Sequence, residues 1–127
     1  MPLNSKLSLG TAQFGLDYGV TNQNGHVAID AVRNILNIAK QSNIRTLDTA
    51  PLYGNSEQVL GKIGINDFQI ITKTTFLKDD INEVIVNFYK SLEKLNREKV
   101  EGLLIHNIGD IENNQFDSLF SKLNELK

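Results

Sequence analysis

Residues 44–73 read IRTLDTAPLYGNSEQVLGKIGINDFQIITK, and the pattern of this stretch decides the fold. It begins with a short apolar run that ends in a carboxylate, at residues 44–48, and it finishes with a second apolar run at 68–73. Between the two runs lie a loop that contains Pro51 and Gly54 and a short segment that is expected to be helical. The stretch therefore predicts a strand, a loop, a helix and a second strand.

The same alternation continues on both sides of this stretch. Short apolar runs predict further strands at residues 7–11 and 100–105. A helix is expected from Ala28, where apolar residues recur at i, i+3, i+4 and i+7, and another from Phe116 to the end of the chain. The order βαβαβαβα is typical of parallel strands joined by right-handed helical crossovers.

Polar residues and glycines indicate where the helix inside this stretch begins and ends. Asn55, followed by Gln58 three residues later, is expected to cap its first turn. The helix is expected to stop near Gly61 or Gly64, because glycine is the usual residue just past a helix end.

The helix with the clearest pattern is expected to begin at Asp79 or Asp80. With Asp80 as its cap, Glu83 completes a pair that resembles a capping box. Apolar residues then line one face of this helix: Ile81, Val84, Ile85, Phe88, Leu92 and Leu95.

The predicted strands are nearly continuous in apolar residues, as at 100–105, instead of alternating with polar ones. Such strands are usually buried on both faces of a parallel sheet. No linker, low-complexity segment or internal sequence repeat divides the chain. We therefore expect a single domain over residues 1–127.

The composition is that of an ordinary globular protein and excludes several functions. The 127 residues carry a formal net charge of −2, which gives no reason to expect binding to nucleic acid or to an anionic membrane. The chain has no cysteine, so neither a disulfide framework nor a cysteine metal site is possible, and we expect no metal. With no long apolar run and no secretory pattern at its start, a cytoplasmic protein is expected.

Three polar residues end successive predicted strands. Asp48, Lys73 and His106 are separated by about one βα unit each, and Tyr53 lies in the loop just past Asp48. Since the carboxyl ends of parallel strands meet at one edge of the sheet, these residues are expected to lie together where α/β folds bind ligands.

The four side chains make a coherent set for proton transfer. A tyrosine is a reluctant proton donor near neutrality, and a neighbouring Lys73 ammonium would favour its phenolate form. Asp48 would hold Lys73 charged and directed, and His106 would donate a hydrogen bond to a carbonyl oxygen or share the proton transfer. The set has no nucleophile next to a base, so acyl transfer fits poorly. It fits proton delivery to a carbonyl that accepts a hydride.

Each residue taken alone also has an ordinary structural interpretation. Asp48 could cap a helix or form a surface ion pair, Lys73 could be solvated, His106 could be a hydrogen-bonded structural residue, and Tyr53 could be a packed aromatic. Their convergence on one edge favours the functional interpretation. His26 lies in a polar loop and is assigned no role.

Residues 48–61 read DTAPLYGNSEQVLG and closely resemble the aldo-keto reductase signature D-T-A-x-x-Y-G-x-S-E-x-x-L-G. Residues 9–15 (LGTAQFG) are similar to the first strand and loop of that family. Residues 72–74 (TKT) resemble its catalytic-lysine strand, and residues 104–106 (LIH) its histidine strand. The resemblance extends over essentially the whole chain.

The resemblance implies a fold, a reaction and a site. The fold is a TIM barrel, and the reaction is hydride transfer from NADPH, or in some members NADH, to a small aldehyde or ketone. Tyr53 would be the general acid, tuned by Lys73 and Asp48, with His106 orienting the carbonyl. The cofactor would lie against Gly10, Thr11, Ala12 and Asp48, and no metal is implied.

The chain corresponds to only the first half of such a barrel. A closed barrel has eight βα units and typically about 250 residues, and the later units that hold the rest of the cofactor have no counterpart here. The expected architecture is a (βα)4 half barrel. It could be a fragment, a truncated gene product, a half covered by another partner, or a homo-oligomer. Self-association is favoured because an open half-core is hard to keep monomeric.

Three functions are compatible with this sequence. The first is an NADPH-dependent carbonyl reductase. The second is a catalytically inactive module of the same fold that binds a nucleotide or a partner, and the third is a structural half barrel without a ligand.

Overall fold

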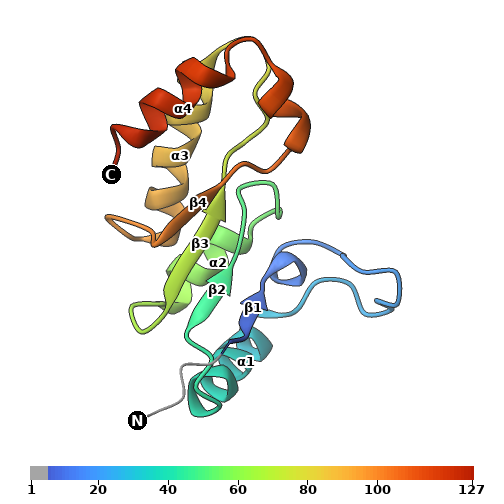
Figure 1. Ribbon diagram of the computed structural model, residues 1–127. Coiled ribbons are helices and arrows are strands. Elements are labelled where there is room, and N and C mark those ends of the chain that lie inside the picture. Colours follow the sequence, from blue (N-terminus) through green and yellow to red (C-terminus); the bar gives the residue numbers. More distant parts are fainter. Residues whose placement is uncertain (1–5) are drawn as a thin grey trace.

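Four parallel strands form one sheet in the computed structural model, which describes residues 6–127. The strands are β1 (Ser8–Gly10), β2 (Thr46–Asp48), β3 (Gln69–Lys73) and β4 (Gly102–Leu104). They lie side by side in chain order, and every neighbouring pair is parallel (Figure 1). The predicted α/β half barrel is thereby confirmed.

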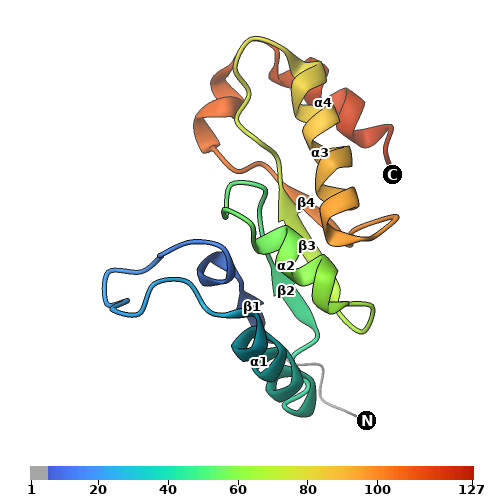
Figure 2. The same cartoon turned by 180° about the vertical axis from the view of Figure 1, so that it is seen from behind.

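The helices cover one face of this sheet. They are α1 (Ile29–Gln41), α2 (Ser56–Ile63), α3 (Ile81–Leu95) and α4 (Phe116–Asn124), with short 3-10 helices η1 (Ala12–Phe14) and η2 (Ile108–Glu112). Seen from behind, α1, α2 and α3 lie in front of the strands (Figure 2). The main core lies between helices and sheet, where Leu36, Leu47, Leu60 and Ile70 are buried.

The opposite face of the sheet is open, and here the expectation of strands buried on both faces was wrong. Successive strand residues point to opposite faces, so Leu47 and Ile70 point to the helices while Ile71 points away from them. Leu104, on the same open face, is 48% exposed. In a closed barrel this face lines the interior, which explains why apolar residues occupy it.

Several element boundaries also differ from those expected. β1 and β4 are shorter than the apolar runs at 7–11 and 100–105. The last helix ends at Asn124 instead of continuing to the end of the chain, and η2 was not predicted.

Of the predicted helix ends, those at Asp80 and Gly64 are confirmed, and the cap at Asn55 is not. Asp80 caps α3 by accepting a hydrogen bond from the amide of Asn82 at 2.8 Å. Gly64 ends α2 with φ +91°. Asn55 precedes α2, but its side chain makes no capping hydrogen bond, so that prediction was wrong. Its backbone, at φ −99° and ψ 17°, lacks the extended conformation that an N-cap residue usually adopts.

Gly61 was a candidate helix end but lies inside α2. A side chain there would overlap the carbonyl oxygen of Lys94. The glycine therefore allows α2 to approach the end of α3 closely.

Among residues 6–127, no helix is long and apolar enough to cross a membrane.

Candidate active site

The register of the sheet places the strand-end residues on its open face. Asp48 is paired with Ile71, and Lys73, two residues further along β3, is paired with Leu104. His106 follows Leu104 by two residues in turn. Since side chains alternate between faces with period two, Asp48, Lys73 and His106 share one face and step along the strands from β2 to β4.

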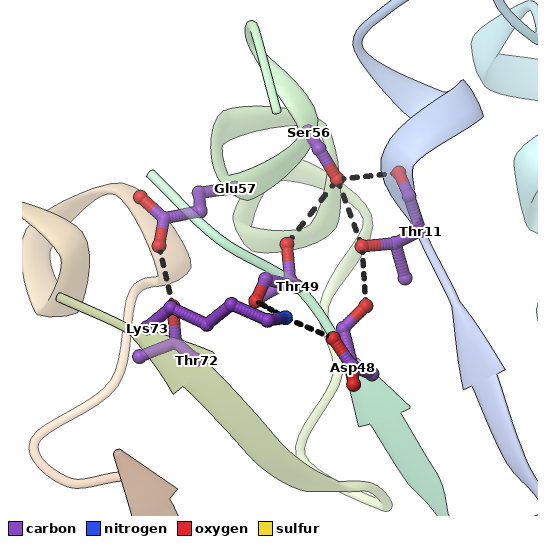
Figure 3. A network of polar contacts seen from close by, with 7 residues as sticks. All are labelled: Thr11, Asp48, Thr49, Ser56, Glu57, Thr72 and Lys73. Carbon is purple, nitrogen blue, oxygen red and sulfur yellow. Dashed lines mark hydrogen bonds and ion pairs between the residues drawn. The ribbon is translucent and has the colours of Figure 1, made fainter. Parts of the chain in front are cut away.

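Lys73 is the centre of a cluster that it forms with Asp48, Tyr53 and His106. Its ammonium forms a short ion pair with Asp48 Oδ1 and donates to the carbonyl oxygen of Thr49 at 2.9 Å (Figure 3). Its side chain is only 14% exposed, against 37% for Asp48. Lys73 Nζ also lies 4.9 Å from the centre of the Tyr53 ring. The ammonium therefore contacts the carboxylate and the aromatic ring together.

Tyr53 is held by a close contact between two loops. Gly54 follows it with φ +56°, a conformation that favours glycine, and a side chain there would overlap the carbonyl oxygen of Gly15. A side chain on Gly15 would in turn overlap the carbonyl oxygen of Tyr53. The amide of Ser56 donates to that same oxygen at 3.0 Å. The backbone at Tyr53 is therefore fixed from two sides.

His106 completes the cluster. Its amide donates to Thr74 Oγ1 at 3.2 Å, and its ring lies edge-on to those of Tyr53 and Phe76, with ring centres 6.1 Å and 5.5 Å apart. Its Nδ1 is buried and has no hydrogen-bond partner within residues 6–127. Within the described residues, Nδ1 therefore has no carboxylate hydrogen-bonded to it that would favour the imidazolium.

The surroundings of His106 favour its neutral form. Burial lowers the pKa of the imidazole, and the Lys73 ammonium lowers it further. Asp110 and Asp48 offset part of this decrease. A neutral imidazole has one N–H donor and one acceptor, so His106 is suited to hydrogen bonding a neutral carbonyl.

We expect the pKa of His106, measured by NMR, to lie below the ordinary histidine value of 6.5. Lys73→Met should raise its titration midpoint because a nearby cation is removed. Asp110→Asn should lower it because an anion is removed. His26→Gln assigns the two histidine signals, and a midpoint at or above 6.5 in the parent protein would contradict the expectation.

A hollow of about 420 Å³ lies beside this cluster, at the carboxyl end of β1. Asp48 and Tyr53 form one side of it, and the other lining residues come from β1 and the loop that follows: Ser8, Gly10, Thr11, Ala12, Gln13, Tyr18 and Gly19. The residues expected to bind the cofactor therefore line one hollow. The hydroxyl of Thr11 is committed elsewhere, since it donates to the carbonyl oxygen of Asp48 at 2.9 Å.

Within residues 6–127, no group of three or more His, Cys, Asp or Glu side chains could hold a metal ion.

The sequence profile of the Aldo/keto reductase family matches residues 6–127. The chain belongs to this family.

Solved aldo/keto reductase structures superpose on this chain. An aldo-keto reductase assigned in Pseudomonas aeruginosa gives a TM-score of 0.78 at 26% identity, over 95% of this chain and 51% of that one. The Brucella melitensis aldo/keto reductase gives 0.64 at 24% identity, over 93% and 43%. A Bombyx mori aldo-keto reductase, solved in complex with NADP, gives 0.59 at 24%, over 78% and 33%. A comparison with curated protein sequences gave no match.

This aldo/keto reductase chain thus spans about half the length of the Pseudomonas structure. The half that it contains includes all four of the residues singled out from the sequence, and the structure places them in contact or close to one another.

Sequence reasoning assigned no role to a layer of buried hydroxyl and carboxyl groups behind these residues. It consists of Thr49, Ser56, Glu57, Thr72 and Thr74, all at most 2% exposed. A signal was available, because Thr72 interrupts the apolar run of β3 at a position that faces the helices. Ser56 and Glu57 lie within the stretch that resembles the family signature.

Proposed function

We propose that this chain carries the proton-transfer part of an NADPH-dependent carbonyl reductase, which converts aldehydes or ketones to alcohols. Family membership supports an oxidoreductase. The observation that carries the proposal is the position of Lys73, whose ammonium contacts both the Asp48 carboxylate and the ring of Tyr53.

In this proposal Tyr53 donates the proton. Its hydroxyl gives a proton to the carbonyl oxygen as a hydride adds to the carbonyl carbon, so that an alcohol forms. The Lys73 ammonium stabilises the phenolate that remains, and Asp48 keeps Lys73 charged and directed at the ring. His106, as a neutral imidazole, donates a hydrogen bond to the carbonyl oxygen and orients it.

The hollow beside β1 suits the nicotinamide end of the cofactor, which supplies the hydride when bound. A side chain on Gly10 would meet no atom within 4 Å, so the backbone there leaves room for a flat ring. The volume of about 420 Å³ is within the usual range for ligand sites, about 300–1,000 Å³. None of the lining residues is Lys or Arg, so the hollow offers no cationic side chain to the cofactor phosphates.

The proposal is tested by two measurements on the same protein. Titration with NADPH, followed by its fluorescence, reports binding, and loss of NADPH absorbance with a small reactive aldehyde reports turnover. Binding with turnover supports the reductase. Binding without turnover supports the second candidate, a nucleotide-binding module without catalysis. The absence of Lys and Arg from the lining is compatible with weak binding of NADPH in either case.

We also propose that a second copy of the chain completes the barrel. Within the described residues, the outer edges of β1 and β4 pair with no strand. Beside β4 lies a groove of about 500 Å³, lined largely by apolar residues: Phe88, Val100, Leu103, Ile105, Phe120, Leu123 and Leu126. Two copies offer two such edges each, and pairing β4 of one with β1 of the other would cover both the groove and the open face. The alternative is a separate second half of the barrel.

Sedimentation is expected to show a particle with twice the 14.2 kDa mass of the chain. Leu104→Lys should shift it towards the monomer, because a charge would enter the covered face. Glu112→Lys, which changes charge at an exposed site in η2, is the matched control. A stable monomer at high concentration would overturn the proposal and favour a separate second half.

A further inference from the structure

Two adjacent residues at the start of α2 connect the strands that carry the site. Ser56 and Glu57 are both buried, at 0% and 2% exposure. Their side chains extend from the helix to three neighbouring strand ends, on the side of the sheet opposite the open face (Figure 3). Neither residue lines the hollow itself, but Ser56 contacts Thr11, which does.

Ser56 connects the ends of β1 and β2. Its Oγ lies 2.9 Å from the carbonyl oxygen of Thr11 and 3.1 Å from Thr11 Oγ1, and 3.3 Å from Thr49 Oγ1. Thr11 Oγ1 donates in turn to the carbonyl oxygen of Asp48 at 2.9 Å. The hydroxyl of Ser56 therefore contacts Thr11, which lines the hollow, and the side chain of Thr49, the residue that follows Asp48.

Glu57 is connected to β3. Its Oε1 accepts a hydrogen bond from Thr72 Oγ1 at 3.0 Å. Thr72 precedes Lys73, and because successive strand residues point to opposite faces, fixing Thr72 on the helix side directs Lys73 to the open side. There its ammonium meets Asp48 and the carbonyl oxygen of Thr49.

The burial of Glu57 makes this hydrogen bond notable. Burial raises the pKa of its carboxyl group, and the Ser91 and Thr72 hydroxyls and the Lys94 ammonium offset only part of the increase. Its Oε2 has no partner in the described part of the chain. A buried, incompletely paired carboxyl group is costly, whereas an apolar residue would fill the same space without that cost. The hydrogen bond to Thr72 links Glu57 directly to β3.

We propose that Ser56 and Glu57 are positioning residues that fasten β1, β2 and β3 to α2, and so hold the Asp48–Lys73 pair in place on the open face. As a statement about catalysis, this inference rests on the proposed function. As a statement about the direction of Lys73, it can be tested without turnover.

The test follows acetylation of Lys73 by an acetylating reagent, with peptide mass spectrometry. In the parent protein Lys73 is paired with Asp48 and little exposed, so its labelling should be slow. Glu57→Leu and Thr72→Val each remove one partner of the buried hydrogen bond and should speed labelling about tenfold. Glu57→Gln keeps an acceptor for Thr72 and should label at nearly the parent rate.

Controls separate local repositioning from general loosening. Glu93→Gln removes a carboxylate from an exposed site on α3 and should leave the labelling of Lys73 unchanged. Amide hydrogen exchange over the whole chain should show increased exchange near β3 alone in Thr72→Val. If Glu57→Leu does not fold, Thr72→Val, which conserves shape, still decides. Ser56→Ala is expected to increase exchange at the ends of β1 and β2 in the same way.

The outcomes distinguish this inference from the proposed function. If Lys73 labelling in folded Glu57→Leu and Thr72→Val equals that of the parent, or if Glu57→Gln is as fast as Glu57→Leu, the positioning role is overturned. If turnover is present, Thr72→Val should lower kcat while KM for NADPH stays constant. If no protein turns over, the proposed function fails, and the labelling rates still decide the positioning role.

Discussion

Tyr53→Phe is expected to lower aldehyde reduction by about 10²- to 10⁴-fold, the usual contribution of a general acid. The change removes only the hydroxyl group. The ring that remains can still pack beside Lys73 Nζ, 4.9 Å from the ring centre, and edge-on to the His106 ring, whose centre lies 6.1 Å away. NADPH binding should therefore be retained, because the hollow beside β1 keeps its shape.

The measurement compares kcat with the dissociation constant for NADPH in the same preparation. Tyr89→Phe is the matched control, because Tyr89 lies on α3 and is 50% exposed, away from the hollow. It should leave both quantities unchanged. If turnover survives in Tyr53→Phe, Tyr53 is not the proton donor, and water or His106 has to take that role.

The alternation of elements and the candidate residues could be read from the sequence because both depend on local patterns. Asp48, Lys73 and His106 each follow an apolar run, and parallel strands bring such positions to one edge. The apolar pattern does not reveal the register of the strands. In the sheet Asp48 is paired with Ile71, two residues before Lys73, and Lys73 is paired with Leu104, two residues before His106. The register depends on how the strands pair and stagger, and the Asp48–Lys73 contact depends on it.

Other features could not be predicted because they arise from tertiary contacts. Asparagine is a suitable residue type for a helix cap, but the backbone of Asn55, which follows Gly54 at φ +56°, is not extended and its side chain makes no capping hydrogen bond. Ser56 and Glu57 are ordinary residues for a first helical turn, and only the packing of α2 on the sheet brings them to Thr11 and Thr72. The continuous apolar strands indicated two covered faces, which a single half barrel cannot supply.

Gly54→Ala is expected to lower the free energy of unfolding by about 2–5 kcal/mol, from two contributions. One part arises from the backbone, since φ is +56° at Gly54 and the left-handed conformation costs a non-glycine residue roughly 1–2 kcal/mol. The other part arises from packing, since the new methyl group would overlap the carbonyl oxygen of Gly15. Overfilling a packed site costs about 1–3 kcal/mol.

Two further glycines separate these contributions in urea unfolding. Gly64 has φ +91° but no atom within 4 Å of an added side chain, so Gly64→Ala should show the backbone cost alone. Gly15 has φ −133°, which any residue adopts, but its side chain would overlap Tyr53 and Ser56. Gly15→Ala should therefore show the packing cost alone.

The comparison also bears on how Tyr53 is positioned. If Gly54→Ala costs no more than the roughly 1–2 kcal/mol of a left-handed backbone alone, the loops at Gly15 and Gly54 do not approach as closely as the structure indicates, and the backbone of Tyr53 is held by its hydrogen bonds alone. If both Gly54→Ala and Gly15→Ala are costly, the folded variants should also lose turnover at constant NADPH affinity. The reason is that relief of the overlap moves the carbonyl of Tyr53, and with it the hydroxyl that has to reach the substrate oxygen, while Lys73 remains fixed on β3.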